Sequence, residues 1–135
     1  MSTIDRPSTG VVVLKHGREK PLRHRHPWVF SGAIDTADAD PGAIVTVRSY
    51  AGEFIGQGYL NPHSQIAVRV LSWREDEVID ADWWRARLQA AIDTRAGLAA
   101  YESLMAYRLV YAESDGLPGL IVDRYDEHLV IQSLT

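Results

Sequence analysis

Apolar and polar residues alternate with the strand period of two through most of the first half of the chain. Ile66, Val68 and Val70 fall on one face of such a run, and Val45 and Val47 fall on one face of another. Five short β-like runs are separated by turn residues, at positions 10–15, 27–34, 42–50, 51–60 and 65–73. Because closing a sheet removes its unprotected edges, this pattern predicts a small β-barrel. The glycines within 51–60 predict a bent or bulged strand that other backbone approaches closely.

The hydrophobic period changes after residue 80. Apolar side chains then recur at helical spacing, at Trp84, Leu88, Ala91, Ile92 and Ala96. With Asp80 or Asp82 placed to cap its N-terminus, this segment predicts one amphipathic helix of about five turns. Three further β-like runs follow at 106–114, 119–126 and 128–135, joined by turns rich in Gly and Pro. The predicted fold is therefore mainly β with α, a small barrel followed by one helix and a β-hairpin region.

These elements divide the chain into three parts. Residues 1–10 lack a periodic pattern and are predicted to be a flexible N-terminus. The barrel is expected over 11–74, and the helix and hairpin region over 75–135. The sequence stops inside its last apolar run without a polar tail, and we interpret the chain as a fragment on that ground.

Composition limits the class of protein. With 135 residues, 46% of them hydrophobic, the chain is long enough for one core with a small appendage. No run approaches the roughly 20 apolar residues that span a bilayer, and the first ten residues have no signal-peptide pattern, so we expect a cytoplasmic protein without membrane contact. The absence of cysteine excludes a disulfide, a thiolate metal site and a cysteine nucleophile within this sequence.

Positive charge is concentrated near the start of a chain whose formal net charge is -4. Residues 11–32 hold five Lys or Arg against a single acidic residue, Glu19. Such a patch attracts a polyanion within a Debye length of about 8 Å, even where the net charge repels it. On charge alone, an RNA-binding face and a solvated basic loop are equally good interpretations. The candidate RNA-binding residues are Lys15, Arg18, Lys20, Arg23, Arg25 and His26.

Two aromatic residues, Trp28 and Phe30, follow the basic segment directly. Exposed aromatic rings beside cations offer stacking surface to bases. In a predicted strand, however, large aromatic side chains are more commonly part of the core. We therefore expect Trp28 and Phe30 to serve mainly in packing.

Five acidic residues gather around the turns of the predicted hairpin: Glu113, Asp115, Asp123, Asp126 and Glu127. Carboxylates of this kind would suit general acid and base chemistry or a magnesium ion, which makes a small metal-dependent enzyme one hypothesis. Carboxylates at Gly and Pro turns more commonly accept backbone N–H groups. Arg108 and Arg124 are also near enough to pair with Asp115 or Asp123. We favour a structural salt-bridge network and assign no catalytic, cofactor-binding or metal-binding residue.

Three blocks of the sequence resemble a known family. "LKHGREKPLRHRHPWVFSGAI", "GQGYLNPHSQIAVRVLSW" and "YRLVYAESDGLPGLIVDRYDEHLVIQ" occur in that order with a helix between the last two. They are similar to the N-terminal part of the S-adenosylmethionine-dependent large-subunit (23S) ribosomal RNA methyltransferases that make 5-methylcytosine. The resemblance implies that 11–74 is a PUA domain, which is a small RNA-binding β-barrel, and that 75–135 is an intermediate region before a Rossmann-like methyltransferase domain.

The resemblance also implies roles for individual residues and partners. It places the basic segment on the RNA side of the barrel, and it gives a barrel-shaping role to Trp28, Phe30, Ser31 and Gly32. The cofactor pocket and the cysteine nucleophile of the family lie downstream, so S-adenosylmethionine would serve the parent enzyme, and this chain alone would not be an enzyme. Expected partners are ribosomal RNA and the missing methyltransferase domain.

Two alternatives to RNA binding remain open. The terminal apolar run 128–134 would present an unpaired sheet edge, which favours a protein-interaction module or a homodimer paired through this strand. The metal-dependent enzyme of the acidic hairpin is the other alternative.

Overall fold

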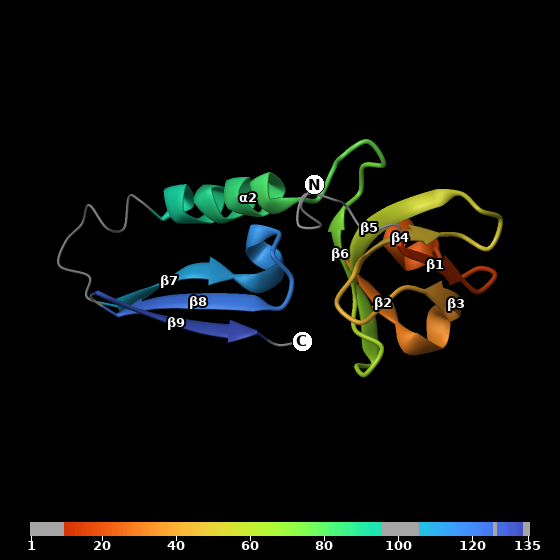
Figure 1. The fold of residues 1–135 in the computed structure, drawn as a ribbon, viewed down its shortest axis with the longest axis horizontal. Helices are drawn as coiled ribbons and strands as arrows, with labels where there is room; N and C mark the ends of the chain where they lie inside the picture. Colours follow the sequence, from red (N-terminus) through yellow and green to blue (C-terminus); the bar gives the residue numbers. More distant parts are fainter. Residues whose placement is uncertain (1–9, 96–105, 126, 134–135) are drawn as a thin grey trace. The chain divides into compact units, whose positions relative to one another are not determined.

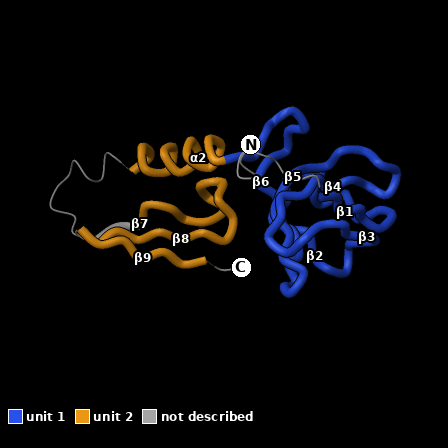
Figure 2. Tube along the Cα trace, in the orientation of Figure 1, with its two compact units in different colours: residues 1–80 blue, residues 81–135 orange. Residues whose placement is uncertain are grey.

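The computed structural model describes residues 10–95, 106–125 and 127–133 (Figure 1). The chain forms two compact units, 1–80 and 81–135 (Figure 2). The strands of the first unit are β1 (Gly10–Leu14), β2 (Trp28–Phe30), β3 (Ile34–Asp38), β4 (Ile44–Arg48), β5 (Phe54–Leu60) and β6 (Ile66–Ser72). It also contains the short helix α1 (Lys20–Arg23) and the 3-10 turn Ser31–Ala33.

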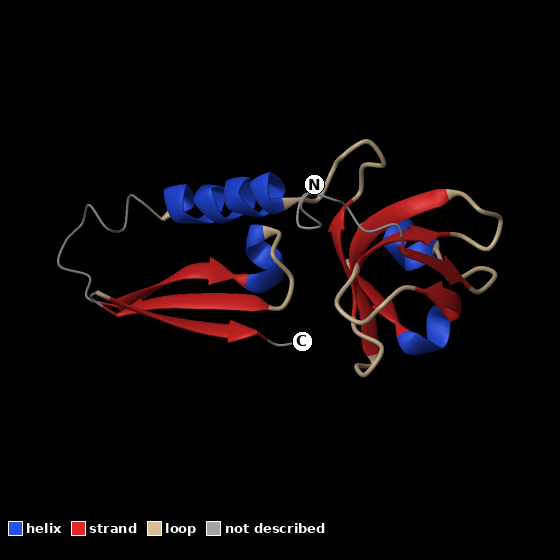
Figure 3. Ribbon diagram, viewed as in Figure 1, coloured by secondary structure: helices blue, strands red, loops and turns tan. Residues whose placement is uncertain are grey.

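The six strands form one curled sheet in the order β2-β6-β5-β4-β1-β3 (Figure 3). All of its pairings are antiparallel except that of β1 with β4. The two edge strands, β2 and β3, follow each other in the chain and are joined by the 3-10 turn. At this turn the Ser31 N–H donates to the carbonyl oxygen of Gln65, and the Lys15 N–H donates to that of Ala33. The predicted barrel-like fold is confirmed, but the predicted strand over 27–34 is shorter than expected, because β2 ends at Phe30 and a separate strand, β3, begins at Ile34.

The core of the first unit lies inside the curl of the sheet. Val12, Leu14, Val45 and Val47 contribute side chains that are at most 1% exposed. They alternate with more exposed neighbours along β1 and β4, as the strand period predicts. Leu22 of α1 joins the same cluster, so the short helix is attached to the barrel through an apolar contact.

Gly58 shows why β5 requires glycine where it pairs with β6. The pairing of β5 with β6 shifts register between Gln57 and Gly58, so the predicted bulge is confirmed. A Cβ atom added at Gly58 would overlap the backbone carbonyl of Arg69 on β6. Only glycine allows the two strands to approach this closely, which draws the sheet into its curl.

The second unit contains the helix α2 (Ala81–Thr94) and the strands β7 (Ala106–Tyr111), β8 (Leu120–Tyr125) and β9 (His128–Ser133). The strands form an antiparallel sheet in the order β7-β8-β9, with the 3-10 turn Ala112–Asp115 after β7.

The buried face of α2 agrees with the predicted one at Ala91, and Trp84 and Leu88 of that face are half-buried. Trp83 and Ala91 are its buried residues, whereas Ile92 is 43% exposed. The prediction that Ile92 belongs to the apolar face is therefore wrong, and Trp83 is buried in addition to the predicted Ala91. The guanidinium of Arg87 lies 4.4 Å from the ring centroid of Trp83 and covers it. The predicted fifth turn and Ala96 lie outside the described residues.

Candidate nucleic-acid interface

Helix α1 organises the basic segment. No helix is predicted here from the sequence, but Pro21 stands in the first turn of a helix, where its missing N–H removes no helical hydrogen bond. Backbone hydrogen bonds close the turn, with the Arg23 N–H donating to the Glu19 oxygen at 3.0 Å. Leu22 is only 3% exposed and faces the core. The charged residues of the helix are therefore directed to its exposed sides.

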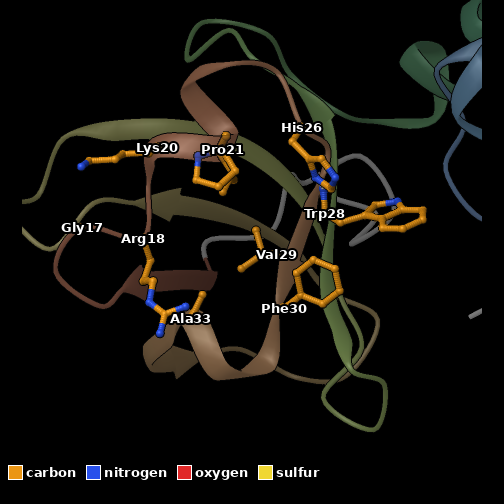
Figure 4. Close-up of a pocket in the computed structure, with 10 residues that line it drawn as sticks. Gly17, Arg18, Lys20, Pro21, His26, Trp28, Val29, Phe30 and Ala33 are labelled. Carbon is orange, nitrogen blue, oxygen red and sulfur yellow. The ribbon is translucent and has the colours of Figure 1, made fainter.

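One side of α1 borders a pocket of about 540 Å³, which we call the aromatic groove (Figure 4). Its lining residues are Gly17, Arg18, Lys20, Pro21, Leu22, His26, Trp28, Val29, Phe30 and Ala33. In Figure 4 the three rings of His26, Trp28 and Phe30 lie on one side of Val29, and Arg18 and Lys20 lie on the other. The groove thus combines an aromatic wall with two exposed cations.

The aromatic wall consists of rings in edge or tilted contact. The ring centroids of His26 and Trp28 are 5.7 Å apart, and those of Trp28 and Phe30 are 6.4 Å apart. The backbone N–H of Trp28 donates to His26 Nδ1 at 3.3 Å, so a neutral His26 carries its proton on Nε2. The Nε2–H group of His26 can donate a hydrogen bond to a ligand, as the phosphate and base contacts of an RNA site require.

The expectation that Phe30 serves mainly in packing is wrong. Its side chain is 49% exposed, whereas Val29 is 1% exposed. Successive side chains of a strand point to opposite faces, and Val29 takes the inward position of β2, so its two aromatic neighbours face outward. Trp28 is half-buried, with the guanidinium of Arg69 5.6 Å from its ring centroid. The sequence offered no signal for this cation–π contact, because Arg69 is far from Trp28 along the chain and comes beside it only when β6 pairs with β2.

The other side of α1 borders a second pocket, of about 390 Å³, which we call the arginine hollow. It is lined by Leu22, Arg23, Arg25, Phe54, Ile55 and Trp73. The guanidinium of Arg25 lies 5.2 Å from the Trp73 ring centroid. Arg23 forms an exposed ion pair with Glu53 of the β4–β5 connection, at 3.1 Å.

The structure therefore divides the predicted RNA-binding residues. Arg18, Lys20 and His26 line the aromatic groove, Arg23 and Arg25 line the arginine hollow, and Lys15 lines neither. Within the described residues, Lys15, Arg18 and Lys20 are exposed and have no ion-pair partner. Uncompensated cations of this kind attract phosphate groups.

Ser31 and Gly32, the predicted barrel-shaping residues, line neither pocket. Both are exposed and belong to the 3-10 turn that joins the two sheet edges. Their role remains a prediction.

The acidic hairpin is held in ion pairs. The Asp115 side chain is 10% exposed and accepts hydrogen bonds from both terminal nitrogens of Arg95, at 3.1 and 2.9 Å. Burial alone would raise the pKa of Asp115, but the hydrogen bonds from Arg95 and from the Tyr111 N–H outweigh burial and place this pKa below its usual value.

Asp123 pairs with Arg108 at 2.7 Å, as the salt-bridge interpretation predicts, and this hydrogen bond raises the pKa of Arg108 above its usual value. In the described part of the chain no three His, Asp or Glu side chains come together as a metal site. Asp126 lies outside the described residues.

Comparison with known proteins defines the class of the first unit. Residues 12–73 match the family model of a PUA-like domain. These residues form the curled sheet and α1, and the predicted barrel-like fold is confirmed. In the described residues no helix is long and apolar enough to cross a membrane.

Two relatives of the chain share one name. It is 45% identical over 126 residues to "Ribosomal RNA large subunit methyltransferase I" of Erwinia tasmaniensis, covering 92% of this chain and 32% of that protein. It is 46% identical over 130 residues to the protein of that name from Photobacterium profundum, covering 94% and 33%. The resemblance to ribosomal RNA large-subunit methyltransferases is thus confirmed. The chain spans about a third of the length of these curated relatives.

Solved structures share the fold. A structure titled as a proposed SAM-dependent methyltransferase from Streptococcus mutans matches with a TM-score of 0.75 at 19% identity, covering 92% of this chain and 33% of that one. A structure of the methyltransferase candidate SMU.776, complexed with SAH, matches with a TM-score of 0.76 at 19% identity, with the same two coverages. At this identity the likeness shows a common fold alone.

The Asp115–Arg95 pair generates a stability prediction. Asp115→Asn is expected to destabilise the second unit by about 3 kcal/mol, because it leaves the mostly buried charge of Arg95 without its carboxylate. Because folding lowers the pKa of Asp115, its ionised carboxylate adds to the free energy of unfolding above a pH of about 4. This stabilisation is lost as the pH falls through the native pKa. Urea denaturation of wild type and variant near neutral and near pH of about 3 measures both effects.

The matched control is Asp76→Asn, since the Asp76–Arg74 pair is mostly exposed and its loss is expected to leave the unfolding midpoint unchanged. The metal-enzyme hypothesis predicts a different result. In that case Asp115→Asn folds with unchanged stability, and the wild type binds Mg²⁺ in a calorimetric titration that the variant abolishes.

Proposed function

We propose that this chain is the RNA-binding N-terminal region of a ribosomal RNA large-subunit methyltransferase, which positions ribosomal RNA for a catalytic domain outside this sequence. The observation that carries the proposal is the aromatic groove of a PUA-like domain, which is lined by the cations Arg18 and Lys20 and by the exposed ring of Phe30. The class of RNA is supported by relatives named ribosomal RNA large subunit methyltransferase I, at 45% and 46% identity.

The chemistry of the groove suits a nucleotide. The ammonium group of Lys20 and the guanidinium of Arg18 bind phosphate oxygens, the latter in a bidentate manner. The exposed face of Phe30 stacks on a base, and a neutral His26 donates from Nε2. These contacts explain an acidic protein binding a polyanion, because the cations act locally while the net charge of -4 is spread over the chain.

Binding at this site assists methylation by proximity. A domain that holds the RNA converts capture by the catalytic domain into an intramolecular step, which raises the effective concentration of the target. This concentration gain offsets part of the few kcal/mol required to expose a stacked base. The region thereby contributes affinity and position, and the reaction itself belongs to the catalytic domain.

The resemblance supports a finer proposal about the parent enzyme. It would transfer a methyl group from S-adenosylmethionine to C5 of cytosine, in the cytoplasm, with a cysteine thiolate as nucleophile. This chain contains no cysteine. Its glycine-rich segment lies in β5, where Gly56 and Gly58 accommodate β6. We therefore assign no residue of this chain to S-adenosylmethionine.

Strand β9 supports a second candidate function, a protein-contact edge. Leu129, Val130 and Ile131 are 57%, 45% and 66% exposed, although β9 is hydrogen-bonded to β8 along one side. An exposed apolar edge pairs readily with another strand, which favours a homodimer or a contact with the rest of the parent enzyme. A homodimer predicts twice the chain mass in light scattering and a return to monomer in Val130→Lys. A monomeric wild type at high concentration contradicts it.

The aromatic groove generates the test of the proposed function. The double variant Arg18→Gln/Lys20→Gln is expected to bind an unpaired ribosomal RNA fragment about tenfold more weakly, and to reduce the slope of log affinity against log salt by about one to two. Fluorescence anisotropy titrations at several salt concentrations measure both quantities.

The control Arg74→Gln/Arg85→Gln removes the same charge from exposed positions outside both pockets, and should leave affinity within about twofold. Equal losses in the two double variants would show that net charge, and not the groove, binds the RNA. Unchanged affinity in both would remove the proposed function.

A further inference from the structure

We infer that the arginine hollow is a second nucleotide subsite, so that one unpaired RNA strand crosses α1 and places neighbouring nucleotides in the two pockets. The inference rests on the proposed function, and it adds a site and the single-stranded form of the bound RNA. Lys20, at the start of α1, lines the aromatic groove and Arg23, at its end, lines the arginine hollow, so α1 is the ridge between the two pockets.

The lining of the arginine hollow has the chemistry of a nucleotide site. Arg23 and Arg25 supply two cations, and Trp73 supplies an indole under the Arg25 guanidinium at 5.2 Å. Arginine planes and indole rings are the surfaces on which unpaired bases stack, and the same guanidinium can bind a phosphate at its edge. The aromatic groove likewise combines cations with aromatic rings.

The backbone at Arg25 directs the basic segment into both pockets. Its φ of 68° lies in the left-handed region, which is uncommon for a residue other than glycine. The Arg25 N–H donates to the Leu22 oxygen at 2.9 Å, and the His26 N–H donates to the Pro21 oxygen at 3.0 Å. After this turn the consecutive residues Arg25 and His26 line different pockets. An RNA strand that crosses the ridge therefore meets His26 on one side and Arg25 on the other.

Glu53 forms an ion pair with Arg23 and competes with phosphate for its guanidinium. The side chains of this pair are 47% and 67% exposed, so water competes strongly for the contact. A phosphate entering the hollow would displace the Glu53 carboxylate, which repels it. Removing the Glu53 charge should therefore strengthen RNA binding, the opposite of the effect expected from a residue that only stabilises the fold.

Two concave pockets on either side of a ridge favour an unpaired strand. In a duplex the bases are stacked inside, and an A-form helix presents mainly phosphates and 2′-hydroxyl groups. Only a strand with splayed bases can place rings in both pockets. The chain should prefer an unpaired oligonucleotide to a duplex of equal length.

The test uses the whole chain, with a fluorescein-labelled oligo(U) RNA of about twelve nucleotides as probe and a duplex of the same length for comparison. Arg25→Gln and Trp73→Leu should each weaken oligo(U) binding about tenfold, and Glu53→Gln should strengthen it a few fold. Arg74→Gln, which removes an adjacent exposed charge, is the matched control and should change affinity by less than about twofold. Because Trp73 packs against the core, thermal unfolding checks that variant, and the exposed Arg25 provides the independent one.

The outcomes separate this inference from the proposed function. Loss of binding in Arg18→Gln/Lys20→Gln with unchanged affinity in Arg25→Gln would overturn the second subsite and leave the proposed function standing. Unchanged affinity in every variant would overturn both. A duplex that binds as tightly as oligo(U), with the same response to the variants, would contradict the unpaired strand.

Discussion

The burial of Leu22 is the contact on which the candidate RNA surface depends. Helix α1 has four residues, too few to be stable without tertiary contacts. Its Leu22 side chain is 3% exposed within the barrel core, and burial of one leucine contributes about 1.5–3 kcal/mol. This anchor fixes a basic turn at the barrel surface, with Arg18 and Lys20 on one side and Arg23 and Arg25 on the other.

The same anchor explains how an acidic chain presents a cationic site. Elsewhere in the first unit, arginines are engaged by acidic neighbours, as in the Arg48–Glu75 and Arg74–Asp76 pairs. Of the cations around α1, only Arg23 has an ion-pair partner among the described residues. The surface potential at the ridge is therefore set by uncompensated charge that lies beside exposed aromatic rings, and this combination distinguishes a nucleic-acid site from a solvated basic loop.

Local patterns in the sequence predicted the features that depend on neighbours along the chain. The alternation of Val45 and Val47, the bulge at Gly58 and the pairing of Arg108 with Asp123 were all accessible in this way. The outward position of Phe30 was not, because the sequence does not show that Val29, and not its aromatic neighbours, takes the inward position of β2. The Arg95–Asp115 pair, too, joins elements that no short-range pattern connects.

The central claim is that RNA contacts the two sides of α1, and the most direct test maps the contact by nuclear magnetic resonance. Amide resonances of the isotope-labelled chain would be followed while unpaired oligo(U) is added. The account predicts that the largest shift changes fall on residues 17–30, with the indole signals of Trp28 and Trp73 moving at the same RNA concentration. Changes confined to β7, β8 and β9, with the signals around α1 unmoved, would contradict it.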